Sequence, residues 1–344
     1  MFTRKPLSPI NQRRWLTFKG NKRGFYSAII FLTVFLLSLF AELIANDKPV
    51  LVVYDGDLYL PALFSYPETT FDGDFETEAD YKDPYVIDLI DAKGWMLWPV
   101  VPFSYHTHIA DLSTPAPSPP SASNWLGTDD QARDVFARVI YGFRISVLFA
   151  LSLAIGSSII GVAIGAVQGY YGGKVDLIGQ RFIEVWSGLP VLFVLIILSS
   201  IITPNIWWLL GIMLLFSWTQ LVDVVRAEFL RGRNLEYVKA ARAMGVSNPV
   251  IMFRHILPNA IVATLTYLPF ILTGAITTLT SLDFLGFGLP PGSASLGELV
   301  AQGKGNLEAP WLGVSAFVVL SLMLTLLVFI GEAVRDALDP RLVK

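Results

Sequence analysis

The sequence contains no cysteine among its 344 residues, and only 15% of its residues are charged. The absence of cysteine excludes disulfide bonds, thiolate metal sites and a cysteine nucleophile. The net charge of -3 gives the chain no overall basic character of the kind that indicates nucleic-acid binding. Apolar residues are abundant instead: 53% of the chain is hydrophobic, and its mean hydropathy is +0.56. This composition predicts an integral membrane protein.

The chain also lacks the G-x-x-x-x-G-K-[ST] loop that binds the phosphates of ATP. Moreover, none of its long apolar segments carries a charge near the middle, where a proton relay would need one. The charges of these segments lie near segment ends, where a side chain can reach the membrane surface. They are Arg144, Arg181, Glu184, Asp223 and Glu332. Energy for uphill transport would therefore have to come from another subunit.

Six apolar segments are long enough to span about 30 Å of hydrocarbon, which takes roughly 20 helical residues. Irregular backbone facing lipid would leave amide groups unpaired, so each segment is predicted to be a helix. The predicted fold is an all-α polytopic membrane protein, whose first segment is an uncleaved anchor rather than a signal peptide. The segments are 26–45, 145–167, 178–202, 206–222, 260–282 and 311–330.

The distribution of lysine and arginine predicts the orientation. Residues 1–25 hold seven basic side chains and no acid, which indicates a cytoplasmic amino terminus. Residues 46–134 hold sixteen acids against four basic residues, which indicates the outer side. Six crossings return the tail, 336–344, to the cytoplasm. Residues 226–258, here called the charged segment, hold six basic residues and two acids and are also predicted to be cytoplasmic.

Residues 46–124 are too long for a simple loop and are predicted to form a small periplasmic domain. Within it, "VLVVYDGDLYL" reads as two short strands joined at Asp55-Gly56, a type I′ hairpin signal. The proline-rich stretch 113–123 reads as an extended linker. Residues 125–144 then read as an amphipathic interfacial helix, begun by a capping box of Thr128 and Gln131.

Two features of the small domain are candidate binding sites, one for a partner and one for a metal. The sixteen acids of 46–134, which include the acidic tract 68–91, read as a solvated face, and the alternative is a dedicated site for a cationic partner. They could also repel or steer a docking protein. His106 and His108 could bind a metal, but no further ligand is organised around them, so two solvated loop histidines are the preferred interpretation.

Two apolar segments carry a periodic stripe of small or polar residues. Glycines that recur every four residues allow a neighbouring helix to approach closely; they are Gly161, Gly165 and Gly169. Threonines share one face of the fifth segment around Pro269. They could line a water-filled path, or they could bond to helix carbonyls and repair a proline kink. These threonines are Thr266, Thr273, Thr277 and Thr280.

The charged segment contains "EYVKAARAMGVSNPVIMFRHILPN", residues 236–259. Its first half is predicted to be a helix that ends at Gly245 and has an open alanine surface at Ala240 and Ala241. A second short helix is predicted to begin with Asn248 as its N-cap and to stop at Leu257-Pro258. The charges of the first helix form one edge, made of Glu236, Lys239 and Arg242. Two short helices joined rigidly to a span make a lever.

The spacing of this stretch resembles the "EAA" cytoplasmic motif of ABC importer permeases. The match comprises Ala240-Ala241, three residues, Gly245, nine residues, and then "HILP". Lys239 occupies the motif's glutamate position, and Glu236 could supply that charge from one turn earlier. The resemblance implies that this segment docks in a groove of an ATPase subunit. The docking residues would be Glu236, Tyr237, Val238, Lys239, Ala240, Ala241, Arg242, Gly245, His255, Leu257 and Pro258.

Two further stretches are similar to the peptide and nickel branch of that family. They are "LGTDDQARDVFARVIYGFRIS", residues 126–146, and "SLDFLGFGLPPGSASLGELV", residues 281–300. In the first, Ala132 stands where a glycine usually precedes the arginine. The enlarged outer segment most resembles that of microcin C and oligopeptide importer permeases of Gram-negative bacteria.

The resemblance implies a non-catalytic permease subunit of the bacterial inner membrane, with no cofactor in this chain. It implies as partners a second homologous permease, two ATPase subunits that bind ATP-Mg, a periplasmic binding protein, membrane lipid and an oligopeptide substrate, but no nucleic acid. Two other classes stay open. An ion-coupled secondary carrier would need a buried carboxylate, and a membrane-anchored scaffold or binding module would work through its periplasmic domain.

Overall fold

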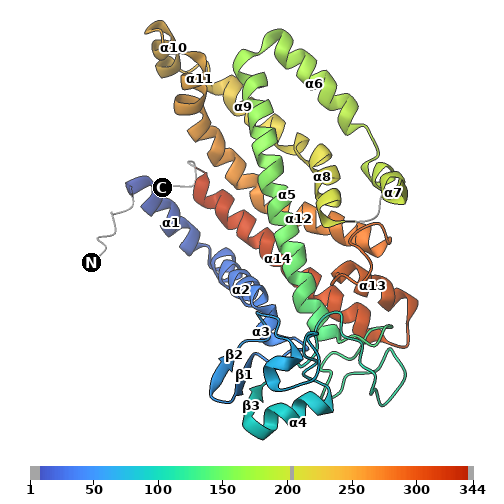
Figure 1. Cartoon of the computed structure of the whole chain (residues 1–344). Helices are drawn as coiled ribbons and strands as arrows, with labels where there is room; N and C mark the ends of the chain where they lie inside the picture. The colour runs from blue at the N-terminus through green and yellow to red at the C-terminus, as the bar shows by residue number, and fades with distance from the viewer. Residues whose placement is uncertain (1–7, 202–204, 340–344) are drawn as a thin grey trace.

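The computed structural model describes residues 8–201 and 205–339, which form a helical bundle with a smaller domain at one end (Figure 1). The small domain, residues 46–124, lies at the bottom of this view, and the charged segment lies at the top. The two parts that differ most in charge are therefore separated by the apolar helices.

Within the described residues, five helical stretches are long and apolar enough to cross a membrane, and a bent pair makes a sixth if its halves count as one crossing. The stretches are α2 (Lys22–Leu39), α5 (Val135–Tyr171), α8 with α9 (Ile206–Ser217 and Thr219–Gly232), α11 through α12 (Asn248–Phe284) and α14 (Pro310–Leu338). The shorter helices include α1 (Pro9–Gly20), α3 (Ala41–Ile44) and α13 (Leu296–Gly305). The structure thus supports five or six apolar crossings.

The third predicted segment, 178–202, is not one straight helix. Within its described part, α6 (Gly173–Ser187) and α7 (Val191–Ile201) are bent by 64° at a short break. Pro190 accounts for the break, because its ring disfavours helical backbone at the preceding residue and it lacks an N–H donor. α7 is apolar, whereas α6 is amphipathic and carries Lys174, Asp176, Arg181 and Glu184. The prediction joins parts of both into one straight span. Residue 202 lies outside the described residues.

The predicted interfacial helix over 125–144 is wrong. The second half of that range forms the first turns of α5, whose N-cap is Asp134; its side chain accepts a hydrogen bond from Ala137 N at 2.8 Å. Thr128 starts no helix. Its hydroxyl accepts a hydrogen bond from Ser118 N at 2.8 Å, which fixes the proline-rich stretch against the start of α5. This stretch is therefore a docked loop rather than a free linker.

The small domain is built on a three-stranded antiparallel sheet in the order β2-β1-β3. The hairpin predicted at Asp55-Gly56 is present, and both turn residues have positive φ, as a type I′ turn requires. The third strand escaped prediction because four residues that directly follow a helix show no alternating pattern. The elements are β1 (Leu51–Tyr54), β2 (Asp57–Tyr59), η1 (a 3₁₀ helix, Glu68–Phe71), α4 (Pro84–Lys93) and β3 (Gly94–Leu97). The chain is therefore mostly helical but not all-α.

Candidate functional site

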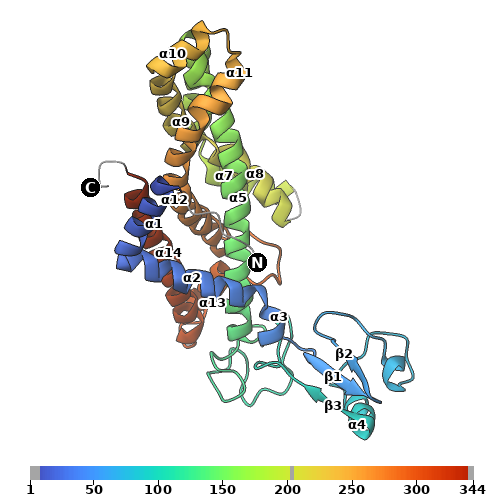
Figure 2. The same ribbon diagram turned by 90° about the vertical axis from the view of Figure 1, so that its left-hand side faces the viewer.

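The charged segment forms the tip of the bundle, beyond the ends of α1 and α14 (Figures 1 and 2). It consists of the end of α9, helix α10 (Glu236–Ala243), helix α11 (Asn248–Val250) and the π-helix η2 (Ile251–Ile256), which continues into α12 (Leu257–Phe284). Two short helices are thus joined by one turn and attached to two long ones.

The turn between α10 and α11 is a Schellman motif at Gly245. The φ angle of Gly245 is 80°, a left-handed conformation that glycine adopts without strain. Val246 N donates to Ala241 O at 3.1 Å and Gly245 N donates to Arg242 O at 3.0 Å, which are the two bonds that define the motif. A Cβ at Gly245 would meet no atom within 4 Å. Backbone conformation, not lack of space, therefore requires glycine here.

The start of α11 differs from the prediction by one residue. Its N-cap is Ser247, not Asn248. The side-chain oxygen of Asn248 instead accepts a hydrogen bond from the Tyr170 hydroxyl at 2.6 Å. The ring of Tyr170 also lies under Arg242, whose guanidinium is 5.5 Å from the ring centre. The backbone carbonyl of Tyr170 accepts a hydrogen bond from Arg233 Nη1 at 3.2 Å. The end of α5 thus anchors the turn, a role that sequence reasoning missed.

Leu257-Pro258 does not stop the second helix, so that prediction is wrong. In a regular α-helix, Pro258 would collide with the carbonyl of the residue four positions earlier and offer it no N–H. Here Leu257 N donates to Met252 O, five residues back, so the helix widens into a π turn and continues. The stretch Asn248–Phe284 therefore runs without a break from the tip into the bundle.

One face of the charged segment packs inward. Val238 and Ala241 are buried in an apolar cluster with Phe229, Ile251 and Ile256, and Leu257 lies partly buried at its edge. Only Ala240 of the alanine pair is exposed, so the predicted open alanine surface is half as wide as expected.

The predicted charged edge divides into two interactions. Lys239 Nζ lies 2.9 Å from Glu236 Oε1, and both side chains are exposed, whereas Arg242 stacks on Tyr170. Glu236 is thus the charge partner of the lysine at the motif's glutamate position. His255 is partly buried, and its carbonyl accepts a hydrogen bond from the Tyr237 hydroxyl at 3.2 Å.

Large apolar side chains are exposed at the tip beside its charged residues. Met244 is 77% exposed and Phe253 70% exposed, and Tyr237 and Val250 are also exposed. Pro258 is exposed at the start of α12. Large apolar side chains in such a position are typical of a surface that is covered by a partner.

The glycine stripe of α5 lies along α9. An added Cβ at Gly161 would stand 2.7 Å from Trp218 O, at Gly165 2.8 Å from Val222 O, and at Gly169 2.5 Å from Arg226 O. Any side chain at these positions would force the two backbones apart. Close packing on α5 therefore fixes α9, the helix that leads into the charged segment.

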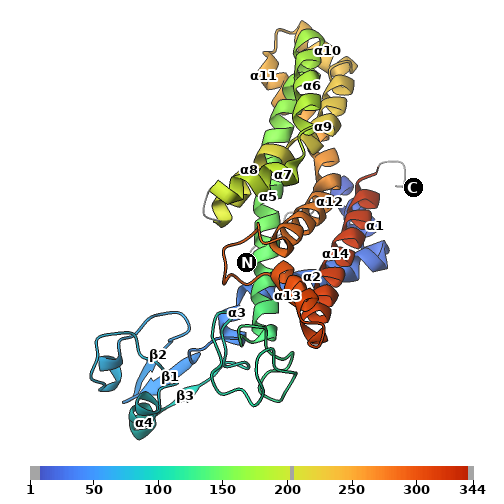
Figure 3. The same ribbon diagram turned by 90° about the vertical axis from the view of Figure 1, so that its right-hand side faces the viewer.

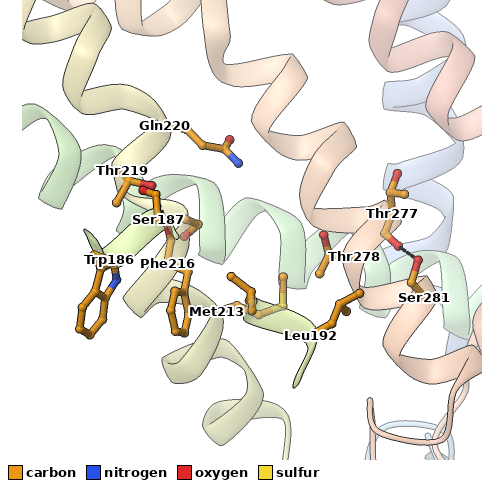
Figure 4. Close-up of a pocket in the computed structure, with 12 residues that line it drawn as sticks. Trp186, Ser187, Leu192, Met213, Phe216, Thr219, Gln220, Thr277, Thr278 and Ser281 are labelled. Atoms are coloured by element: carbon orange, nitrogen blue, oxygen red, sulfur yellow. Dashed lines mark hydrogen bonds between the residues drawn. The ribbon is translucent and has the colours of Figure 1, made fainter. Parts of the chain in front are cut away.

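A cavity of about 390 Å³ opens where α6 bends into α7, between the α8–α9 junction and α12 (Figure 4). Trp186 and Phe216 stack with ring centres 5.5 Å apart and form an aromatic wall. Hydroxyl groups and the amide of Gln220 supply the polar part of the lining. The residues with hydroxyl groups are Ser187, Ser217, Thr219, Thr277, Thr278 and Ser281. Such a mixed lining can hold a polar solute that also carries apolar side chains.

The four threonines of α12 do not form one lining. Thr277 lines the 390 Å³ cavity, whereas Thr266 lines a second cavity of about 750 Å³ near the termini. Three of the hydroxyls bond to the carbonyl four residues earlier: Thr266 to Val262, Thr273 to Pro269 and Thr277 to Thr273. Back-bonding therefore explains most of the stripe, and only Thr277 faces the cavity beside the bend.

A buried ion cluster joins α5 to α13 at the end near the small domain, and sequence reasoning missed it. Arg133 Nη2 lies 2.6 Å from Asp129 Oδ2 and 3.0 Å from Glu298 Oε1. Arg138 Nη2 lies 2.8 Å from Glu298 Oε2, and its side chain is fully buried. Glu298 is 165 and 160 residues away from the two arginines, so no local pattern could have paired them.

Comparison with known proteins gives a consistent result. A family described as "Binding-protein-dependent transport system inner membrane component" matches residues 138–344. The chain is 60% identical over 334 residues to the inner membrane ABC transporter permease protein YejE of Escherichia coli (strain K12), covering 97% of this chain and 98% of that protein. It is 57% identical over 358 residues to the peptidoglycan transport system permease protein YejE of Agrobacterium fabrum, covering 97% and 94%.

A more distant relative is the oligopeptide transport system permease protein OppC of Haemophilus influenzae. It is 33% identical over 258 residues, covering 75% of this chain and 81% of that protein. The resemblance deduced from the sequence motifs is thereby confirmed.

Proposed function

The chain belongs to the family of binding-protein-dependent transport system inner membrane components, and from this premise we propose that it forms half of a peptide path through the bacterial inner membrane. The chain is a multi-pass inner membrane permease, and ATP is hydrolysed by separate subunits of such importers. The relatives are named for peptidoglycan and oligopeptide transport, which supports oligopeptides as the substrate. Microcin C, a peptide antibiotic, is a further candidate cargo that only the sequence resemblance supports.

The proposed topology has six crossings with both termini in the cytoplasm and the small domain in the periplasm. The bent pair α6–α7 would be the third crossing. The seven basic residues of 1–25 and the acid excess of 46–134 support this orientation.

The proposed assembly contains a second permease, two ATPase subunits that bind ATP-Mg, and a periplasmic binding protein. The exposed tip of Met244, Phe253 and Tyr237 supports the contact with an ATPase groove. Of the motif residues, Val238, Ala241 and Leu257 would act by holding the tip together rather than by touching the partner, because they face the chain's own core.

One observation carries the proposal: an uninterrupted helical stretch, Asn248–Phe284, connects the exposed tip to the cavity wall at Thr277. The stretch stays helical through the π turn before Pro258 and past Pro269, although both prolines lack a backbone N–H, so no loop interrupts the connection. Motion of an ATPase against the tip would therefore reach the cavity directly.

The proposed mechanism is alternating access. ATP closes the two ATPase subunits, the tips move with them, and the helices around the cavity rearrange between an outward-open and an inward-open form. Coupling requires that the ATPase binds the tip differently in the two forms, since equal binding to both would shift nothing.

The test is reconstitution of the complex purified from its native membrane. We expect this chain to co-purify with a second permease and an ATPase, and peptide-loaded binding protein to stimulate ATP hydrolysis in proteoliposomes. Site-specific cross-linking from position 244 should reach the ATPase. A tip that cross-links to no ATPase in any nucleotide state would contradict the proposal.

A further inference from the structure

One face of the small domain's sheet is uncovered and entirely apolar. Residues directly opposite each other on antiparallel strands point to the same side. Val53 pairs with both Leu58 and Trp95, and Leu51 pairs with Leu97. Since Leu51 and Val53 are two residues apart, all five side chains share one face. We call this set, Leu51, Val53, Leu58, Trp95 and Leu97, the sheet face.

The opposite side of the sheet is the covered one. Val52, Tyr54, Tyr59 and Met96 pack there with Phe71 and with Val86 and Ile90 of α4. On the sheet face, by contrast, Leu58 is 70% exposed, and Trp95 and Leu97 are each 51% exposed. Five apolar side chains without a charge among them indicate that another surface covers this face.

The charge of the small domain argues against a bilayer as the cover. Its lysines are already paired or partly buried: Lys48 pairs with Glu78, Lys93 pairs with Asp72, and Lys82 Nζ donates to Pro102 O at 2.6 Å. Hydrogen bonds from Lys93 and Lys48 lower the pKa of Asp72 and of Glu78, respectively. The remaining acids, which include Asp55 at the hairpin turn, give the domain a negative surface that anionic phospholipid would repel.

The composition of the sheet face also argues against a transient partner. Interfaces that form and dissociate are about as polar as ordinary surface, whereas permanent ones resemble a domain core cut in half. A binding protein that must leave in each cycle would expose these five side chains to water each time.

The small domain is fixed to the membrane helices. The Tyr141 hydroxyl of α5 donates to Ala45 O at 3.0 Å, and Arg144 Nη1 lies 2.8 Å from Glu42 Oε1. Val101 N donates to Ile44 O at 2.9 Å, which ties the chain just after β3 to α3. In Figures 2 and 3 the sheet stands beyond the edge of the bundle, on the side of α8 and away from α14. It therefore overhangs the space beside the helices, where a neighbouring membrane protein would stand.

We propose that the sheet face is a permanent docking surface for the outer part of the second permease, so that the two permeases contact each other outside the membrane as well as within it. The matching surface is apolar and bordered by lysine or arginine opposite Asp55. This inference rests on the proposed function, which supplies the second permease.

The experiment builds the photoreactive group into the chain, so that no reagent has to enter a buried interface. Leu58 and Trp95 are each replaced by p-benzoylphenylalanine, the complete complex is illuminated, and the adducts are identified by mass spectrometry. We expect both positions to give an adduct with the second permease whether or not binding protein is present. The same replacement of Phe75, which is 62% exposed in the same domain but outside the sheet, is the control and should give no such adduct.

A second measurement is the stability of the assembly. The double variant Leu58→Asn with Leu97→Thr places polar residues at positions that are exposed in this chain, so its own fold should be preserved. The variant should release the second permease at a lower detergent concentration than the wild type does. Phe75→Asn should have no such effect. An adduct that forms only when binding protein is added, an adduct with lipid alone, or no adduct would each overturn the inference. If the wild-type chain co-purifies with no second permease, the proposed function fails instead.

Discussion

Ala132 has a backbone conformation that is unusual for an alanine. Its φ angle is 60°, and the family resemblance places a glycine at this position. A left-handed conformation costs a residue with a Cβ roughly 1 kcal/mol. Ala132 N donates to Asp129 O at 3.1 Å, so this turn aligns Asp129 with the buried arginines.

Ala132→Gly is therefore expected to stabilise the folded chain by about 0.5–1 kcal/mol, because it relieves strain without removing a contact. Thermal unfolding of the purified protein in detergent measures this. A decrease in melting temperature would show that the greater conformational freedom of glycine in the unfolded chain outweighs the relief of strain.

Gly245 offers a sharper test of the turn in the charged segment. Gly245→Val places a β-branched side chain at positive φ and should abolish transport while leaving membrane insertion intact. Gly245→Asp should be less severe, because aspartate tolerates this conformation better. Uptake of labelled peptide and membrane fractionation measure the two properties.

The matched control is Gly211→Val. Gly211 also has no atom within 4 Å of an added Cβ, but it lies inside the helix α8 and has no left-handed φ. Wild-type uptake by Gly245→Val would remove the turn from the mechanism, and a more severe effect of aspartate would point to charge instead of conformation.

Thr277 and Thr273 separate the two explanations of the threonine stripe. Both hydroxyls bond to a carbonyl four residues earlier, but only Thr277 lines the 390 Å³ cavity. Thr277→Phe should lower uptake about tenfold or more by filling the cavity, and Thr273→Phe should do so much less. Equal losses at matched protein levels would assign both residues to the helix backbone alone.

At the scale of elements, the ion cluster links the start of α5 to α13. Removing one partner of a buried pair leaves an uncompensated charge and costs about 3–5 kcal/mol. Arg138→Met and Glu298→Gln should each destabilise the chain by that order, and the double variant by less than the sum. Urea or thermal unfolding in detergent gives the coupling energy.

The control for this cycle is the exposed pair of Arg181 and Glu184, at 2.5 Å. Its removal should change stability by less than about 1 kcal/mol. Additive effects of Arg138→Met and Glu298→Gln would mean that the two groups do not interact in solution.

The elements that sequence predicted well are those defined by local pattern. The hairpin turn is determined by its own two residues, Asp55 and Gly56, and the end of α10 is determined by the positive φ that Gly245 adopts. Prediction failed where distant parts decide. Pro258 is predicted to end the helix, but a π turn accommodates it. The start of α5 is predicted to lie in the membrane interface, but its Arg138 pairs with Glu298 of α13, far away in the sequence. The bend between α6 and α7 is different, because Pro190 marks it locally and the prediction nevertheless runs one helix through that proline.

At the scale of the whole molecule, the proposed orientation can be tested with single cysteines. Met244→Cys at the tip should react with an impermeant maleimide only from the cytoplasmic side. Phe75→Cys in the small domain should react only from the periplasmic side. Right-side-out and inverted membrane vesicles provide the two exposures, and labelling of both residues from one side would overturn the six-crossing topology.

The unbroken run from Asn248 to Phe284 has a thermodynamic consequence for the cargo. If a displaced tip reshapes the cavity, then an occupied cavity must alter the affinity of the tip for the hydrolase by the same factor. Binding of a peptide in the cavity should therefore change how the ATPase binds the tip, and the change is transmitted along the helical stretch Asn248–Phe284. The dissociation constant of the hydrolase from the two permeases should therefore differ with and without cargo, and the ratio of the two constants should equal the change in peptide affinity that the hydrolase produces.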